Sequence, residues 1–294
     1  MRKIVILLML LCQISFLSAQ NDTTKYGVVM PKGFTAKIDV IYDKVADWEG
    51  KMDIYMPFNE GKATPVVINI HGGGWNHGSK EKQKGFGSFF KNKMAVVNMS
   101  YRLVDVAPAP AAIEDVRSVL IYLVKHAEEL NIDTNKIIMM GGSAGGHLAM
   151  MGGYLNNNTT FDKDKEALKN LKIAAVINKY GIGDMIDFSI GENPYKSAVR
   201  WVGTRITDKD FIKSVSPLYY IDKNTPPTFI VHGDADPIVP YKQSLVLEKT
   251  LTKNNIVHEF ITVEGGGHGK FDKDKQTEIS KATILFLEGL GLTK

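Results

Sequence analysis

The sequence predicts an α/β fold built on a mostly parallel, doubly wound sheet. Short apolar runs at 66–70, 136–140, 173–177 and 228–231 alternate with longer segments, several of which have helical spacing. A run that is apolar throughout is typical of a strand buried on both faces, as in a parallel sheet. The order strand, helix, strand, helix then favours a sheet covered by helices on both faces.

The size and composition are those of an ordinary globular protein. Of its 294 residues, 44% are apolar and 23% are charged. An α/β core of this size lies within the usual range of one domain. We find no internal repeat, no low-complexity tract and no internal boundary, so we expect a single domain over residues 20–294.

The first 19 residues have the three zones of a secretory signal peptide. Arg2 and Lys3 precede an apolar stretch at 4–11, and small and polar residues lead to Ala19. The apolar stretch is shorter than the roughly 20 residues of a spanning helix, which disfavours a membrane anchor. A lipoprotein reading of Cys12 is weaker, because the residue before it is not small. We expect a secreted or periplasmic protein without a membrane segment after cleavage.

Cleavage after Ala19 has two chemical consequences. It removes Cys12, the only cysteine of the chain, so the mature protein has neither disulfides nor a cysteine nucleophile. It also lowers the formal net charge from +4 to +2, because two basic residues leave. A nearly neutral protein gives no electrostatic case for binding nucleic acid or anionic lipid.

The first half of the chain begins with two β-rich segments at 35–42 and 51–56, predicted to form a hairpin around a loop at 43–50. A buried strand is predicted at 66–70, a short helix within 81–91 and another strand at 94–101. A helix is predicted at 111–130, because apolar residues recur there at helical spacing.

The second half repeats the pattern of strand and helix. Strands are predicted at 136–140, 173–177, 228–231 and 258–263, and helices over 147–153, 241–253 and 277–290. The connection at 181–216 is long for a link between two such elements. It either caps a site or packs as ordinary surface helices, and the sequence leaves both interpretations open.

One pentapeptide has the pattern of a turn that presents a reactive serine. Gly141-Gly-Ser-Ala-Gly145 follows an apolar strand and precedes a helix, which is the setting of a G-x-S-x-G turn that exposes its serine. Ser143 is therefore the candidate nucleophile. Upstream, His71-Gly-Gly-Gly74 follows another strand, where donors for an oxyanion hole are needed. The candidate donors are the backbone N–H groups of Gly73, Gly74 and Ala144.

Two further groups complete an acyl-transfer site. His268 lies in a glycine-rich loop after the last predicted strand and is the candidate base. Asp234 and Asp236 both follow the strand at 228–231, and position alone does not choose between them as the acid. Each candidate follows a predicted strand, so all are expected at one edge of the sheet.

These motifs resemble the α/β-hydrolase fold, and more narrowly the esterases with an HGGG loop, which include feruloyl-esterase-like, acetyl-xylan-esterase-like and hormone-sensitive-lipase-like enzymes. The resemblance covers nearly all of the chain after the signal peptide. It implies an eight-stranded sheet, a small insert after the sixth strand, and the order Ser143, Asp236, His268 for the catalytic residues. It implies Asp236 as the acid, because the last aspartate of an H-G-x-x-D-x-x-V-P segment holds that role. No cofactor and no metal are expected.

The substrate is predicted less sharply than the reaction. Export and the resemblance together favour a short acyl or feruloyl ester on a carbohydrate. Trp75, beside the glycine loop, either offers a flat face to a sugar or simply packs in the interior. A general carboxylesterase and an arylformamidase-like hydrolase are the alternatives within the same class. A non-catalytic binding module is the alternative of another class, disfavoured because all three catalytic residues are retained.

Overall fold

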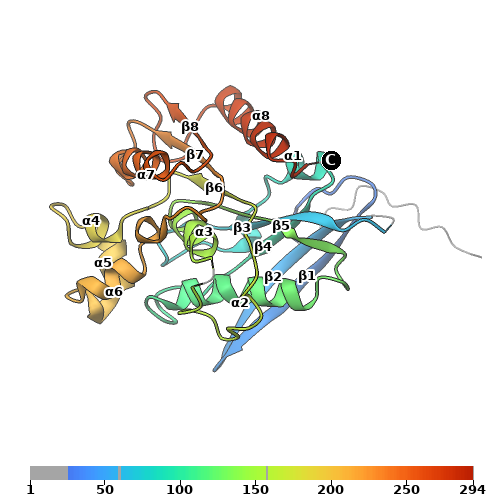
Figure 1. Cartoon of the computed structure of the whole chain (residues 1–294), viewed down its shortest axis with the longest axis horizontal. Coiled ribbons are helices and arrows are strands. Elements are labelled where there is room, and N and C mark those ends of the chain that lie inside the picture. The colour runs from blue at the N-terminus through green and yellow to red at the C-terminus, as the bar shows by residue number, and fades with distance from the viewer. Residues whose placement is uncertain (1–25, 59–60, 157, 294) are drawn as a thin grey trace, which may run out of the picture.

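Eight strands form one continuous sheet in the computed structural model, which describes residues 26–58, 61–156 and 158–293 (Figure 1). The proposed signal peptide lies outside these residues. Strand β2 runs antiparallel to both of its neighbours, β1 and β4, and every other neighbouring pair is parallel. The predicted mostly parallel, eight-stranded sheet is thereby confirmed. In spatial order the strands are β1 (Phe34–Val45), β2 (Trp48–Pro57), β4 (Ala95–Met99), β3 (Thr64–Ile70), β5 (Ile132–Gly142), β6 (Ala175–Lys179), β7 (Thr228–Gly233) and β8 (His258–Val263).

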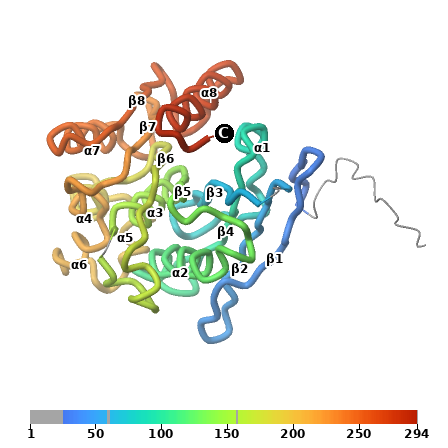
Figure 2. Tube along the Cα trace, turned by 45° about the vertical axis from the view of Figure 1, so that its right-hand side comes forward, coloured from blue at the N-terminus to red at the C-terminus, as the bar shows by residue number. Residues whose placement is uncertain are grey.

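Helices cover both faces of the sheet, as Figures 1 and 2 show. Helices α2, α3 and α7 pack on one face and α1 and α8 on the other. Within the described residues, no helix combines the length and apolar character needed to cross a bilayer. The helices are α1 (Gly87–Lys91), α2 (Ala111–Lys125), α3 (Ala144–Tyr154), α4 (Met185–Ile190), α5 (Lys196–Val202), α6 (Lys209–Ser214), α7 (Lys242–Lys253) and α8 (Lys273–Gly289), with 3₁₀ turns η1 (Lys80–Lys82), η2 (Gly203–Arg205) and η3 (Pro217–Tyr220).

The central strands are buried on both faces, as their apolar sequences predict. All seven residues of β3 are buried. Ile68 packs with the helices α2 and α3, whereas its neighbour Val67 packs with α1 and α8. This alternation follows from the two-residue period of a strand, and it divides the core into two layers.

The hairpin at the start of the fold is tighter than predicted. The predicted loop at 43–50 is wrong, because strand pairing continues to Val45 and Trp48, which face each other across a two-residue turn. Ala46 in that turn has a positive φ of 49°. A Cβ at Gly50 would lie 2.6 Å from the Tyr42 ring, so the glycine lets this ring lie across the neighbouring strand. The polar residues at 43–50 reflect the exposure of this hairpin and do not mark an irregular loop.

Two predicted helix bounds also change. Helix α2 ends at Lys125, five residues before the predicted end at 130, and His126 closes it through a contact of 2.8 Å between its Nδ1 and the Tyr122 carbonyl. The segment 81–91 divides into η1 and α1 instead of forming one helix. Helix ends are decided by such capping contacts, which apolar spacing does not report.

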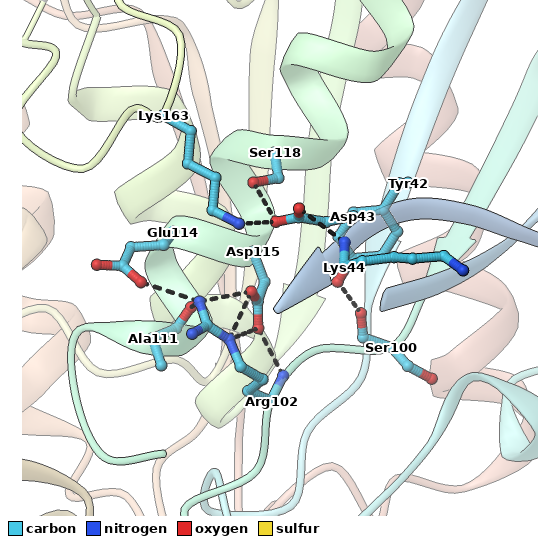
Figure 3. Close-up of polar contacts among 10 residues, drawn as sticks. All are labelled: Tyr42, Asp43, Lys44, Ser100, Arg102, Ala111, Glu114, Asp115, Ser118 and Lys163. Carbon is cyan, nitrogen blue, oxygen red and sulfur yellow. Dashed lines mark hydrogen bonds and ion pairs between the residues drawn. The ribbon is translucent and has the colours of Figure 1, made fainter. Parts of the chain in front are cut away.

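A buried ion pair fixes the loop between β4 and α2 (Figure 3). Arg102 donates to the Asp115 carboxylate from Nε (2.8 Å) and also bonds Glu114 and the Ala111 carbonyl. The Arg102 and Asp115 side chains are 7% and 0% exposed, so they share a site that is largely closed to water. On the same face of α2, the Asp43 carboxylate accepts from the Ser118 hydroxyl (3.0 Å), which ties β1 to this helix.

Replacing Arg102 with leucine is predicted to lower the free energy of unfolding by about 3–5 kcal/mol, because the buried Asp115 carboxylate loses its counter-charge. The matched control is Arg200→Leu. It removes an ion pair with Asp105 whose side chains are 57% and 67% exposed, and it should cost no more than about 1 kcal/mol. Urea unfolding of both variants measures the difference. Equal losses would contradict the importance given to the Arg102 pair.

Candidate active site

The parallel strands bring the predicted site residues to one edge of the sheet. The glycine loop follows β3, Ser143 follows β5, Asp236 follows β7 and His268 follows β8. The register aligns Ile70 with Gly141 and Gly142 with Lys179, so the ends of these strands coincide. Loops at the carboxyl edge of a parallel sheet commonly form the ligand site.

Ser143 occupies a strained turn between β5 and α3. Its φ of 57° and ψ of −125° are unusual for a residue with a side chain. The turn depends on glycine at two places where the backbone passes very close. A Cβ at Gly141 would lie 2.2 Å from the Gly145 carbonyl oxygen. A Cβ at Gly145 would lie 2.2 Å from the Ile70 carbonyl oxygen. The G-x-S-x-G spacing therefore has a steric cause.

A cavity of about 520 Å³ opens at this edge, and six of the predicted residues line it. They are Gly73, Gly74, Trp75, Ser143, Ala144 and His268. Its volume lies within the range of small-molecule sites. The structure thus brings the candidate nucleophile, the candidate base and the candidate oxyanion donors around one space.

The loop after β3 is held open toward this cavity by packing on its other side. His71 is buried and stacks on the Tyr101 ring, with ring centroids 4.2 Å apart. The Tyr101 hydroxyl donates to the His71 carbonyl at 3.1 Å. Gly73 has a φ of 120°, and a Cβ there would lie 2.0 Å from the His77 carbonyl oxygen. Only glycine fits the position of Gly73, and the packing of His71 orders the loop.

Asp236 and not Asp234 lies beside His268. The Asp236 Oδ2 atom is 2.7 Å from His268 Nδ1, while Asp234 accepts a bond from the Gly265 N–H on the exposed side of the loop. Burial by itself raises the pKa of the Asp236 carboxyl. Hydrogen bonds from His232, from His268 and from two backbone N–H groups outweigh that burial and hold the pKa well below its ordinary value.

His232 is a residue of this site that the sequence analysis gave no role. It is fully buried, and its Nε2 atom lies 3.2 Å from Asp236 Oδ2 and 3.0 Å from the Val239 carbonyl. Both acceptors require the proton on Nε2, so Nδ1 accepts from the Ser244 hydroxyl at 2.7 Å. His232 thus contacts the same carboxylate oxygen of Asp236 as His268 does. Its position at the start of the acid loop was the only signal of this role.

Tyr180 is a second residue that the sequence analysis missed. It follows β6 directly, and its ring centroid lies 4.8 Å from that of His268 at an angle of 61°. A Cβ at Gly269 would lie 2.4 Å from the Tyr180 hydroxyl oxygen, so the glycine after His268 admits the ring. Tyr180 therefore limits how the imidazole can turn.

Of the two interpretations of Trp75, its burial favours packing in the interior over a flat face for a sugar, although the residue borders the cavity. The side chain is fully buried and stacks on Trp201, with ring centroids 4.7 Å apart. His147 packs edge-on against both indoles. The backbone of Trp75 has a φ of 58°, which turns the ring inward beneath the glycine loop. Trp201 lies 126 positions further along the chain, so local sequence gave no indication of this stack.

The long connection at 181–216 forms a wall of the cavity. It contributes Ile182, Phe188 and Ser197 to the lining, which favours the interpretation of this segment as a cap. Four hydrogen bonds fix it to different parts of the fold. They join Ala109 N–H to the Trp201 carbonyl (2.7 Å), His147 Nε2 to the Val215 carbonyl (2.8 Å), Gly183 N–H to Gln243 Oε1 (3.0 Å) and the Tyr195 hydroxyl to the Pro237 carbonyl (2.7 Å).

A protein-family model with the description BD-FAE matches residues 52–251, which is more than half of the chain. The chain belongs to the BD-FAE family. The expected likeness to α/β-hydrolase esterases is confirmed by this match and by the structural relatives. The match spans β2 to α7, so His268 lies beyond the matched residues.

Relatives of this BD-FAE chain include esterases of bacteria. It is 27% identical over 238 residues to Esterase LipC of Mycobacterium tuberculosis, covering 77% of this chain and 58% of LipC. The chain spans about half the length of the curated relatives it matches, from 43% to 58%. Among solved structures, it resembles a truncated carbohydrate esterase from gut microbiota (28% identity, TM-score 0.75, covering 87% of this chain and 96% of that one). It also resembles a bifunctional GH43-CE protein of Bacteroides eggerthii (27% identity, TM-score 0.74, covering 86% and 38%).

His147 is predicted to make the BD-FAE chain less stable in acid. Burial lowers its pKa from the ordinary 6.5 to about 4, although its bond to the Val215 carbonyl acts in the opposite direction. The unfolded chain then binds the proton more tightly, so stability is intact above pH 6.5 and falls as the pH drops toward 4. At about 1.4 kcal/mol for each unit between the two pKa values, the full loss is about 3 kcal/mol.

Urea unfolding at pH 7.5, 5.5 and 4 measures this dependence. His147→Gln is the comparison variant, because glutamine does not titrate yet keeps an N–H donor for Val215. The variant should lose less stability than the wild type between pH 7.5 and 4. Equal losses in the two proteins would rule out His147 as the cause.

Proposed function

We propose that this BD-FAE chain is a serine-dependent carboxylic ester hydrolase acting on short acyl or aromatic acyl esters of carbohydrates. One observation carries the proposal: His268, bonded to the buried Asp236, lines the same cavity as Ser143 at its strained turn. A nucleophile, a base and a carboxylate that orients the base are the parts that acyl transfer requires.

The proposed reaction has two steps. His268 takes the proton of the Ser143 hydroxyl as the serine oxygen attacks the ester carbonyl carbon, and the carbonyl electron pair moves to its oxygen. The backbone N–H groups of Ala144, Gly73 and Gly74 are the proposed donors to this oxyanion. When the carbonyl re-forms, the bond to the alcohol breaks and the alcohol leaves with the proton from His268. Water, activated by the same histidine, then hydrolyses the acyl-serine.

Asp236 is the proposed orienting group for the base. Its carboxylate stays ionised because its pKa is held below the ordinary value, so it accepts the Nδ1 proton of His268. The Nε2 atom of His268 is then left free of a proton and available to Ser143. The second bond, from His232, keeps the carboxylate in place when the imidazole becomes charged.

The lining of the cavity supports a small acyl group and a polar alcohol. Apolar side chains come from the connection at 181–216 and from the acid loop, namely Ile182, Phe188, Ile238 and Val239. Polar side chains come from the segment after β3, namely Asn76, His77 and Gln83. Hydroxyl-rich sugars bind well to such amide and imidazole groups, whereas an acyl chain favours the apolar side. The likeness to a carbohydrate esterase supports the same choice of alcohol.

Export and independence of metal belong to the same proposal. Residues 1–19 are proposed as a signal peptide, which delivers the enzyme to the secreted or periplasmic space, where polysaccharides are met. The proposed chemistry uses protein groups alone, with neither cofactor nor metal. No partner other than the ester substrate is proposed.

Replacing Asp236 with asparagine is predicted to lower kcat for p-nitrophenyl acetate by about 10⁴, because the imidazole loses the acceptor that sets its tautomer. Asp234→Asn is the matched control, since it changes a carboxylate of the same loop that bonds only the Gly265 backbone among the described residues. That variant should keep kcat within about tenfold. Both are compared with Ser143→Ala as the baseline. A large loss in Asp234→Asn with a mild one in Asp236→Asn would reverse the assignment.

A substrate panel tests the proposed specificity. Acetate should be released from acetylated xylan, or ferulate from methyl ferulate, and p-nitrophenyl acetate should be cleaved faster than the butyrate and octanoate. The preference for a short acyl group has a physical reason, because the connection at 181–216 lies close to the glycine loop. A Cβ at Gly74 would lie only 3.1 Å from the Ser197 Cβ. Ser143→Ala gives the background rate. Preference for butyrate or longer chains, with no release from the first two substrates, would instead indicate a general carboxylesterase.

A further inference from the structure

A second cavity adjoins the one that contains Ser143. Its volume is about 360 Å³, and it lies between α1, α8 and the ends of β6 and β7. Lys179 and Tyr180 line both cavities, so these two residues form the boundary between them. The helices α1 and α8 lie side by side in Figures 1 and 2. Nothing in the proposed reaction uses this space.

The lining of the second cavity is polar and carries one formal charge. Hydroxyl and amide side chains come from the two helices, namely Ser88, Gln276, Ser280 and Thr283. Lys179 is the charged residue of the lining, and no aspartate or glutamate is found among the described residues that form it. Gln276 already donates to the Phe271 carbonyl (2.7 Å) and Thr283 to the Ile279 carbonyl (2.8 Å), so the Ser88 and Ser280 hydroxyls are the donors beside Lys179. A cavity with one cation and hydroxyl donors is suited to an anionic group of a ligand.

The strand period directs Lys179 toward this cavity. Alternate residues of a strand point to the same face, so Lys179 shares the face of Ile177. Ile177 packs in the layer of α1 and α8, the helices that enclose the second cavity. Asn178, one residue earlier, instead reaches α3 and its neighbours on the opposite face, where it accepts from the Gly181 N–H at 3.0 Å.

Lys179 has no acidic partner among the described residues, and it makes no side-chain hydrogen bond there. It is partly buried, and burial lowers the pKa of its ammonium group. The contrast with Lys80 is informative. That lysine is 1% exposed, and its Nζ atom lies 2.7 Å from both Asp39 and Asp53. The fold therefore supplies carboxylates to Lys80 but none to Lys179 among the described residues. The charge of the Lys179 ammonium is then available to a carboxylate or other anion of a ligand.

We propose that the second cavity is a subsite in which Lys179 binds the carboxylate of a uronic acid residue belonging to the carbohydrate substrate. The proposal deepens the proposed function and rests on it for the identity of the ester substrate. The volume is large enough for one sugar ring, and the hydroxyl and amide groups of α1 and α8 face its hydroxyls. Since the two cavities share a boundary, a uronic acid next to the acylated sugar reaches Lys179 while the ester lies at Ser143.

Direct binding tests the subsite without any need for activity. D-Glucuronate, D-glucose and inorganic phosphate are titrated separately into the full-length protein, and Kd is measured by NMR. Glucuronate should bind about tenfold more tightly than glucose, the effect of one charge-assisted hydrogen bond. Lys179→Met should abolish the difference and Lys179→Arg should retain it. Lys253→Met, which removes an exposed charge in α7, should retain it as well. Equal binding of glucuronate and glucose, or binding of phosphate alone, would overturn the uronate subsite.

Kinetics then connect the subsite to the ester reaction. The measured quantity is kcat/KM for acetylated glucuronoxylan oligosaccharides divided by kcat/KM for acetylated xylan oligosaccharides without uronic acid. In the wild type this ratio should exceed one. It should fall about tenfold in Lys179→Met, mainly through a change in KM, and Lys179→Arg should restore it. A ratio that does not respond to the charge at 179 contradicts the proposal. Glucuronate binding through Lys179 without hydrolysis of any ester would refute the esterase and leave the anion subsite standing.

Discussion

The site depends on how closely the backbone around Ser143 approaches the end of β3. At Gly145 the nearest carbonyl oxygen belongs to Ile70, and a Cβ placed there would come within 2.2 Å of it. A Cβ on Gly72 would likewise lie 2.8 Å from the Gly142 carbonyl oxygen. This contact between the serine turn and the glycine loop places the candidate oxyanion donors beside Ser143, the proposed nucleophile. Any larger residue would separate the two loops and so separate Ser143 from the candidate donors.

Asp236, the proposed acid, is fixed in place by a different means from Ser143, the proposed nucleophile. The carboxylate of Asp236 receives the Ile238 and Val239 backbone N–H groups on one oxygen and two histidines on the other. Its side chain is 0% exposed, and the four donors offset the cost of burying the charge. Only one of the two imidazoles lines the cavity with Ser143. Placement of the acid is thus a property of the folded loop and not of one salt bridge.

The sequence predicted the residues whose roles depend on local chain geometry. The individual strands, the turn at Ser143 and the loop of His268 were all visible as short motifs, because each is formed by contiguous residues. Position alone left Asp234 and Asp236 open, since both follow the same strand, and the resemblance to known esterases chose the one that lies against His268.

Contacts between distant segments were not visible in the sequence. The sequence left the role of Trp75 open, because its stacking partner, Trp201, lies in another part of the chain. Tyr180 was overlooked for the same reason, because its neighbour His268 follows another strand, β8. His232 was overlooked although its partner Asp236 is only four residues away, because the fold of the acid loop turns both side chains toward each other. The hairpin loop was predicted too long because polar residues are equally compatible with an exposed strand.

The connection at 181–216 is anchored at four points, and this has a consequence for turnover. The wall is bonded to α3, to α7, to the acid loop and to the segment before α2, so any swing would have to break contacts with four separate parts of the fold. For the proposed esterase, this anchoring argues against a swinging lid, so substrate entry and product release need not wait for a movement of the wall. Activation at an oil–water interface requires a lid to be displaced, and it is therefore not expected of the proposed esterase.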